Sequence, residues 1–162
     1  MSHYPVSELI KTLHGVHQVE YWVGVPDTRL KPLLDGISGL VEIEYAPRED
    51  LAVAAAFGAS LAGFRACVFM KDAGLGHCLD ALLTTFRLAG LPLTLVVSTA
   101  EPTTKMPLHH QTWHDVLIKI LEALAIPART ISDTARNDLS IFVGRSIARD
   151  EIHAILIDIR LT

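Results

Sequence analysis

The sequence lacks the residues that would build a disulfide framework, a nucleic-acid surface or a membrane anchor. Its 162 residues include only two cysteines, Cys67 and Cys78, which form no C-x-x-C pair and so argue against a disulfide framework or a structural zinc site. The net charge is −4 and no basic run is visible, so nucleic acid is not an expected partner. No apolar segment approaches membrane-spanning length and the N-terminus lacks the features of a signal peptide, so we expect a cytoplasmic protein.

Two common phosphate-binding motifs are also missing. Neither a P-loop nor a G-x-G-x-x-G pattern occurs, which counts against nucleoside triphosphates and, more weakly, against nicotinamide cofactors. A hydrolase or a phosphate-binding domain would need such a loop or a nucleophile elbow, and the sequence shows neither.

The composition that remains is typical of a buried parallel sheet. Half of the residues are hydrophobic, 20% are charged and 6% are aromatic. The length suits one domain, which we expect to span residues 1–162.

Apolar runs and helical patterns alternate along the chain. The expected strands lie at 19–25, 41–44, 66–70, 92–98, 128–131 and 154–159. The expected helices lie at 7–17, 28–34, 78–88, 112–124 and 138–149, with an alanine-rich helix after Pro47. Thr28 and Thr112 are the expected N-caps of two of them, and Gly90 the expected left-handed residue that closes a third.

Alternating strands and helices predict an α/β fold of three layers, with a mostly parallel six-stranded sheet covered by helices on both faces. Ligands of such sheets bind beyond the carboxyl ends of the strands. Asp27, Glu49, the glycine loop at 71–76 and the pair His109 and His110 all follow strand ends, so we expect them to share one edge of the sheet.

The stretch 44–76 combines an acidic turn, a helix of small residues, a buried strand and a glycine loop. Glu49 and Asp50 fall at the expected start of the helix, where the helix dipole favours negative charge. One face of this helix carries little side-chain bulk and is expected to pack very close to a neighbour. Its small residues are Ala52, Ala55, Gly58, Ala56, Ala59 and Ala62.

Three segments carry a resemblance to a known family. They are G-V-P-D-T-R-L-K at 24–31, R-E-D-L-A-V-A-A-A-F-G-A-S-L-A-G at 48–63 and D-A-G-L-G at 72–76. In this order they resemble the pyrimidine-binding domain of thiamine-diphosphate-dependent 2-oxo acid decarboxylases. The likeness is greatest to the alpha subunit of sulfopyruvate decarboxylase and the N-terminal half of phosphonopyruvate decarboxylase.

The resemblance implies a role for Glu49. In this family a glutamate binds the ring nitrogen of the cofactor's aminopyrimidine and so activates thiamine diphosphate. Glu49 matches that glutamate, whereas from the pattern alone it would merely favour the helix N-terminus. The G-D-G stretch that binds the diphosphate through Mg²⁺ is absent. The resemblance therefore implies a hetero-oligomer such as α2β2, in which a beta subunit holds the diphosphate and Mg²⁺.

The glycine loop departs from the family pattern. Relatives typically carry Q-N-S-G-L-G-N, whereas this chain has K-D-A-G-L-G-H at 71–77. By resemblance Gly74, Leu75 and Gly76 border the cofactor, although a G-L-G stretch is also compatible with a simple tight turn. Lys71, Asp72 and His77 are candidates for the substrate, but Lys71 could equally pair with Asp72 in solvent.

His109, His110 and Gln111 form a second candidate group. Some decarboxylases of the family carry an H-H pair in this segment, where the histidines handle protons and hold the substrate carboxylate, and imidazole titrates near the working pH. The alternative is a polar loop that contains two of the eight histidines by chance. Arg29 is a further candidate for an anionic substrate, although such residues are more often solvated.

The expected function is that of the alpha subunit of a decarboxylase, a carbon-carbon lyase, acting on an anionic 2-oxo acid similar to sulfopyruvate or phosphonopyruvate. Two alternatives stay open. The chain could be a non-catalytic assembly subunit of the same fold, for which the altered glycine loop is the evidence. It could also serve a carboligase, because carboligation starts from the same activated cofactor.

Overall fold

The structure is a computed structural model that describes residues 3–99, 108–131, 136–158 and 160–161. Its strands are β1 (His3–Tyr4), β2 (Val19–Gly24), β3 (Ile43–Tyr45), β4 (Arg65–Lys71), β5 (Leu93–Ser98), β6 (Ala128–Thr130), β7 (Ile152–Ile157) and β8 (Arg160–Leu161). Its helices are α1 (Val6–Ile10), α2 (Lys31–Ser38), α3 (Glu49–Leu61), α4 (Gly74–His77), α5 (Leu79–Leu82), α6 (Leu108–Ala123) and α7 (Arg136–Ala148). Two π-helical segments, η1 (Lys11–Val16) and η2 (Leu83–Arg87), continue α1 and α5.

Six of the strands form one parallel sheet in the order β3-β2-β4-β5-β7-β6. The expected α/β fold and each of the six expected strands are thereby confirmed. The chain runs outward from β2 to β3 and then returns past β2 to β4, so its winding reverses beside β2. In sheets of this kind ligands bind beyond the carboxyl ends of the strands at such a reversal, which here are the ends of β2 and β4.

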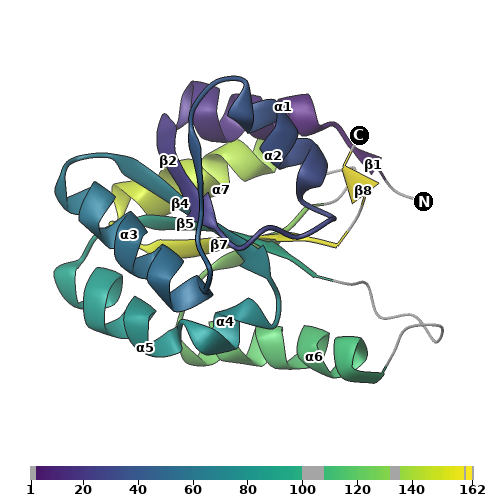
Figure 1. The fold of residues 1–162 in the computed structure, drawn as a ribbon, viewed down its shortest axis with the longest axis vertical. Coiled ribbons are helices and arrows are strands. Elements are labelled where there is room, and N and C mark those ends of the chain that lie inside the picture. Colours follow the sequence, from purple (N-terminus) through teal and green to yellow (C-terminus); the bar gives the residue numbers. More distant parts are fainter. Residues whose placement is uncertain (1–2, 100–107, 132–135, 159, 162) are drawn as a thin grey trace.

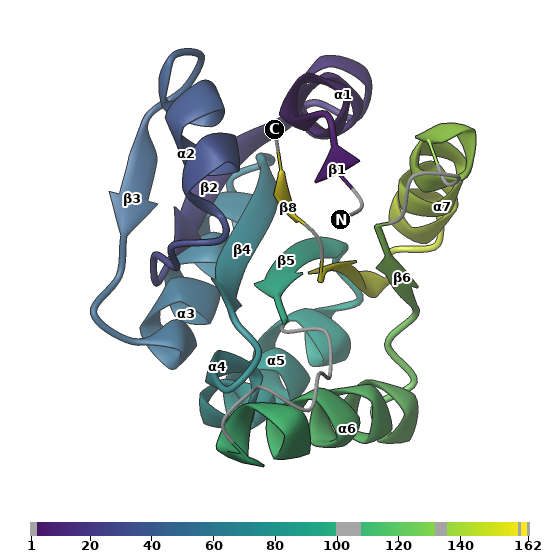
Figure 2. The ribbon, with the colours of Figure 1, turned by 90° about the vertical axis from the view of Figure 1, so that its right-hand side faces the viewer.

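Helices cover both faces of this sheet, as Figures 1 and 2 show. The helices α3, α5 and α6 lie on one face, and α1, α2 and α7 lie on the other. Side chains alternate along the central strands to serve both layers. In β4, Val68 and Met70 enter the first core and Cys67 and Phe69 enter the second. This double burial explains why the strands read as continuous apolar runs.

The start of α3 follows from local sequence. Arg48 is its N-cap with an extended backbone, and Glu49 and Asp50 occupy its first turn. The buried residues Ala52 and Ala56 turn toward the sheet, where α3 packs on β2 and β4. The close neighbour expected for the small-residue face is therefore the chain's own sheet.

Two helix starts differ from the sequence prediction. The helix expected at 28–34 begins at Lys31, because Asp27 accepts a hydrogen bond from the backbone N–H of Arg29 and closes a turn first. Thr28 is therefore not its N-cap, which is Leu30. The helix expected from Thr112 begins earlier, at Leu108, so Thr112 is not a cap either.

The glycine segment is more ordered than the predicted loop. Lys71 is the last residue of β4, and Gly74 to His77 form the single helical turn α4. Gly90 has a φ of 62°, so the predicted left-handed residue after the following helix is confirmed.

The ends of the chain add a small element that the sequence pattern did not predict. His3–Tyr4 and Arg160–Leu161 pair as a two-stranded parallel sheet, so β1 and β8 lie side by side (Figure 2). Within the described residues, no helix has the length and apolar character needed to cross a membrane.

A histidine is built into the middle of the sheet. His153 on β7 is fully buried, and its Nε2 accepts a hydrogen bond from the Thr94 hydroxyl at 3.1 Å while Nδ1 contacts the Glu151 carbonyl at 3.3 Å. Burial lowers the pKa of His153 from 6.5 to about 4, with a smaller contribution from the nearby His17. The imidazole is therefore neutral in the folded protein near pH 7.

This neutral histidine predicts a loss of stability in mild acid. The unfolded chain takes up the proton first as the pH falls, so the stabilisation is complete above pH 6.5 and disappears as the pH approaches 4. We expect the free energy of unfolding to fall by about 3 kcal/mol from this group, measured by denaturant titration at several pH values. His153→Gln should flatten this dependence, and parallel curves for the two proteins would contradict the assignment.

Candidate active site

Three strand ends meet at one edge of the sheet. The Ser98 hydroxyl at the end of β5 donates to Asp27 Oδ1 over 2.9 Å, and the backbone N–H of Asp72 donates to the Ser98 carbonyl over 2.9 Å. These contacts join the segments that follow β2, β4 and β5. The expectation that Asp27 and the glycine segment share an edge is met.

Glu49 lies at this edge, in the first turn of α3. Its side chain is 13% exposed, and its Oε2 lies 2.9 Å from Nδ1 of His77 in α4. Because an ionised carboxylate can only accept, Nδ1 of His77 carries the hydrogen and donates it. The carboxylate is thus held at a helix start and reaches the border of the fold without being sealed inside it.

The two glycines of α4 make room for other side chains of the same protein. A Cβ on Gly74 would lie 2.6 Å from Oε1 and Cγ of Glu49, and one on Gly76 would lie 3.0 Å from the Trp113 ring. The sequence predicted a close approach to a ligand at this G-L-G stretch. In the folded chain, the side chains that approach these glycines are Glu49 and Trp113.

Asp72 is buried in front of α4. Only 1% of it is exposed, its Oδ1 accepts the backbone N–H of Ala73 at 2.8 Å, and its Oδ2 is buried without a hydrogen-bond partner among the described residues. It does not form the solvent-exposed ion pair with Lys71 that the sequence left open. A buried carboxylate oxygen in this position offers an acceptor to a donor from outside the described chain.

Arg29 is engaged with the protein itself. Its Nη1 donates to the Thr99 carbonyl over 2.8 Å, and the Thr99 hydroxyl lies 3.1 Å from Nδ1 of His114 in α6. These contacts tie the β2–α2 turn to the end of β5 and to α6. Arg29 therefore has a clear structural role.

The structure describes the remaining predicted residues in less detail. Lys71 is half-buried at the end of β4. The backbone of His109, His110 and Gln111 lies in the first turn of α6, a helix that reaches the site through Trp113, but their side chains lie outside the described residues. The histidine pair is therefore part of a helix and does not belong to a polar loop.

Several contributors escaped the sequence pattern. Ser98, Thr99, Trp113 and His114 build the edge, and no motif singled them out. Gly76 was a possible signal in the sequence, because a large ring that packs against this position requires a residue without a side chain. The contact between His77 and Glu49 joins residues 28 positions apart and had no local signature.

The two cysteines do not supply a nucleophile. Burial raises the pKa of Cys78 to about 12, with a further contribution from the Glu49 charge, and burial raises that of Cys67 well above its ordinary value. Both thiols are free and buried. Among the described residues, no cluster of three His, Cys, Asp or Glu side chains could hold a metal ion.

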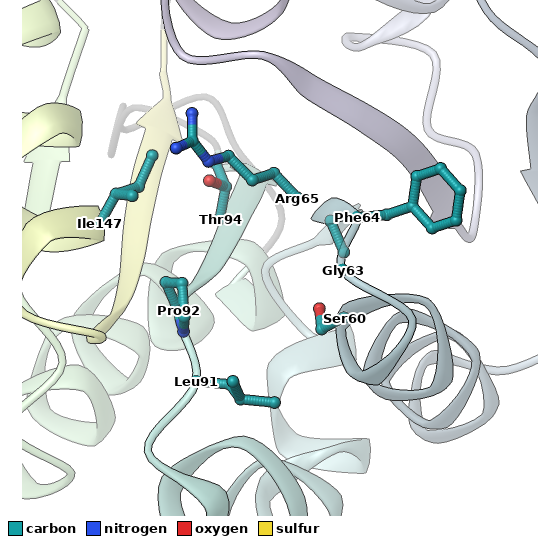
Figure 3. Close-up of a pocket in the computed structure, with 9 residues that line it drawn as sticks. Ser60, Gly63, Phe64, Arg65, Leu91, Pro92, Thr94 and Ile147 are labelled. Carbon is teal, nitrogen blue, oxygen red and sulfur yellow. The ribbon is translucent and has the colours of Figure 1, made fainter.

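Cavities lie at both edges of the sheet. A cavity of about 140 Å³ lies near the start of β4 and β5, where Figure 3 shows Ser60, Arg65 and Thr94 around it. This is the amino-terminal edge, opposite Glu49. A more open hollow of about 470 Å³, lined by Asp27 and Tyr45, lies at the candidate edge.

The sequence is similar to two curated relatives. It is 26% identical over 150 residues to the sulfopyruvate decarboxylase subunit alpha of Methanothermobacter thermautotrophicus, which covers 87% of this chain and 88% of that protein. The chain is a homologue of sulfopyruvate decarboxylase alpha subunits. The sulfopyruvate decarboxylase subunit alpha of Methanococcus maripaludis is 26% identical over 82 residues, or 49% of each chain. No protein-family model matches the chain.

A solved structure shows the same fold. The thiamine diphosphate-dependent 4-hydroxybenzoylformate decarboxylase of Rhodococcus jostii RHA1 superposes with a TM-score of 0.71 at 17% identity and covers 98% of this chain. The chain spans 32% of the length of that decarboxylase, about a third of it. The family resemblance seen in the sequence is thus confirmed for the homology to alpha subunits and for the fold.

The packing of Glu49 on Gly74 can be tested by adding one methyl group. Gly74→Ala places a Cβ within 2.6 Å of the Glu49 side chain, so we expect a loss of about 1–3 kcal/mol in the free energy of unfolding, measured by chemical denaturation. Gly58→Ala on α3 is the matched control, since a Cβ there meets nothing within 4 Å and should stabilise the helix by about 0.5–1 kcal/mol. Equal stability of Gly74→Ala and the parent would show that Glu49 does not pack there.

Proposed function

We propose that the chain is the alpha subunit of a thiamine-diphosphate-dependent decarboxylase that acts on an anionic 2-oxo acid. In this proposal Glu49 activates the aminopyrimidine ring of the cofactor, and a separate beta subunit binds the diphosphate and Mg²⁺. The observation that carries the proposal is the position of Glu49, nearly enclosed at the carboxyl edge of the sheet in a homologue of sulfopyruvate decarboxylase alpha subunits.

The residues at this edge fit an aminopyrimidine ring. Glu49 offers a carboxylate to a ring nitrogen, and Asp72 Oδ2 is a buried acceptor that lacks a donor among the described residues. The absence of a side chain at Gly74 leaves the Glu49 carboxylate room at the border of the fold. The acceptor on Asp72 suits the amino group of such a ring, and the Glu49 carboxylate suits its basic nitrogen once that nitrogen carries a proton.

The chemistry divides between cofactor and protein. When bound, thiamine diphosphate supplies the electron sink that decarboxylation of a 2-oxo acid requires. Glu49 contributes an oxygen that shares a proton with the ring nitrogen, and its low exposure of 13% keeps water from competing for that proton. His109 and His110 remain the proposed proton carriers for the substrate, with Gln111 beside them.

The proposed partner has a surface to dock on. The outward side of α3 carries Leu51 at 50% exposure and Leu61 at 65%, with the exposed Ala54 and Gly58 between them. Apolar side chains so exposed on the helix that begins with Glu49 suit contact with another subunit. A beta subunit seated there would bring its cofactor to Glu49 and close the site to water.

Lys71 is the main reason for proposing a negatively charged substrate. Lys31 pairs with Asp35 and Arg48 pairs with Asp50, so these cations are already partly neutralised. Lys71 forms no ion pair with another described residue and lies half-buried at the end of β4. A negative group on the substrate, such as a sulfonate or phosphonate, would find its counter-charge in Lys71 and in the guanidinium of Arg29.

A non-catalytic assembly subunit is the second candidate. It is favoured by the altered glycine turn, in which Lys71, Asp72 and His77 replace the amides of the family pattern. It is also favoured by the hydrogen bond between His77 and Glu49, because this bond already uses the carboxylate. A carboligase is compatible with the same site, because the same activated cofactor begins both reactions.

Glu49→Gln tests the proposal directly. The amide keeps the size of the side chain but cannot take the proton, so we expect the turnover of the reconstituted complex to fall by about 10²–10⁴-fold. Asp50→Asn is the control, because Asp50 belongs to the same helical turn but pairs with Arg48 in solvent. Unchanged turnover in Glu49→Gln would favour the assembly subunit.

A further inference from the structure

The partners in the contact between His77 and Glu49 differ greatly in exposure. The His77 side chain is 67% exposed, whereas that of Glu49 is 13% exposed, and Nδ1 lies 2.9 Å from Oε2. The imidazole therefore lies on the solvent side of a carboxylate that is otherwise enclosed. A group that binds Oε2 competes with this ring for the same oxygen.

The two side chains also differ in how freely they can move. Glu49 belongs to the first turn of α3, and its Cγ, Cδ and Oε1 lie against the backbone of Gly74. His77 is the last residue of the short α4, and most of its ring is in solvent. Exposed side chains change rotamer rapidly, whereas an enclosed one needs its neighbours to shift. The imidazole is therefore the partner that gives way.

We propose that His77 is a placeholder for the cofactor, whose Nδ1–H holds the Glu49 carboxylate in the free chain and is displaced when the aminopyrimidine ring binds. This inference rests on the proposed function of Glu49. The imidazole presents an N–H to the carboxylate oxygen from a flat ring, and the aminopyrimidine does the same once its ring nitrogen has taken up a proton from solvent. One can replace the other while α3 and α4 stay in place.

In this proposal His77 is a positioning residue that acts on Glu49. The sequence had suggested a different role for it, contact with the substrate. His77 satisfies a nearly enclosed carboxylate until the complex assembles, since an unpaired buried acceptor is unfavourable. It also competes with the cofactor for Oε2, which lowers the apparent affinity of the free chain. Removal of the imidazole should therefore tighten binding of the pyrimidine ring.

The test uses the full chain with ¹⁵N-labelled histidine and the probe 4-amino-2-methylpyrimidine. On titration at millimolar concentration we expect the Nδ1 signal of His77 to move toward that of a free imidazole. His77→Ala should bind the probe about threefold to tenfold more tightly, as expected for loss of one competing hydrogen bond. His77→Gln, whose amide N–H can still reach toward the carboxylate, should fall between the two. The signal of His14, bound to the Val19 carbonyl at the other edge, is the internal control.

The outcomes distinguish this inference from the proposed function. The placeholder is overturned if His77→Ala binds the probe equally or more weakly, if it does not bind the probe at all, or if the His77 signal stays unchanged while the probe binds. Unchanged probe binding by Glu49→Gln would instead count against the role of Glu49 itself. Loss of binding in Glu49→Gln without tighter binding in His77→Ala would leave the role of Glu49 intact and remove that of His77.

Discussion

The contact between the Glu49 carboxylate and the backbone of Gly74 is the constraint on which the candidate site depends. A Cβ at position 74 would lie only 2.6 Å from Oε1 of Glu49, so the Glu49 side chain can keep this position against α4 only when residue 74 is glycine. This packing encloses the carboxylate without sealing it. Nδ1 of His77 contacts Oε2 of Glu49 from the solvent side at 2.9 Å.

The fold delivers these groups to one place through its strand ends. Every strand of the six-stranded sheet runs in the same direction, so the turns after β2, β4 and β5 gather at one edge. Ser98 joins two of those turns through Asp27 and Asp72. Helix α6 adds Trp113 against Gly76 and so fixes the far side of α4. The sheet supplies position, and the side chains at its edge supply the chemistry.

The sequence was sufficient for the fold and for one side of the site. Apolar runs located all six strands of the main sheet because burial on both faces leaves an unmistakable composition, and the acidic start of α3 located Glu49. Helix starts were less accurate. Asp27 forms a turn that delays α2, and α6 begins a turn before Thr112, since local capping patterns do not reveal which backbone groups tertiary contacts satisfy.

The partners of Glu49 could not be predicted in the same way. The bond to His77 joins residues 28 positions apart, and the glycine turn reads equally well as a ligand site or as room for the protein's own side chains. Nor did the sequence reveal that Asp72 is buried with Oδ2 unpaired among the described residues. Such contacts depend on how elements distant in sequence pack together.

In the proposed function, Glu49 contributes to a cofactor that is anchored chiefly by another subunit. The most direct measurement is the affinity for thiamine diphosphate with Mg²⁺, determined by calorimetry for the chain alone and for the chain mixed with a beta subunit that carries the G-D-G motif. Weak binding alone and tight binding in the mixture is the result expected of a shared site. Tight, Mg²⁺-dependent binding with full turnover by the isolated chain would contradict it.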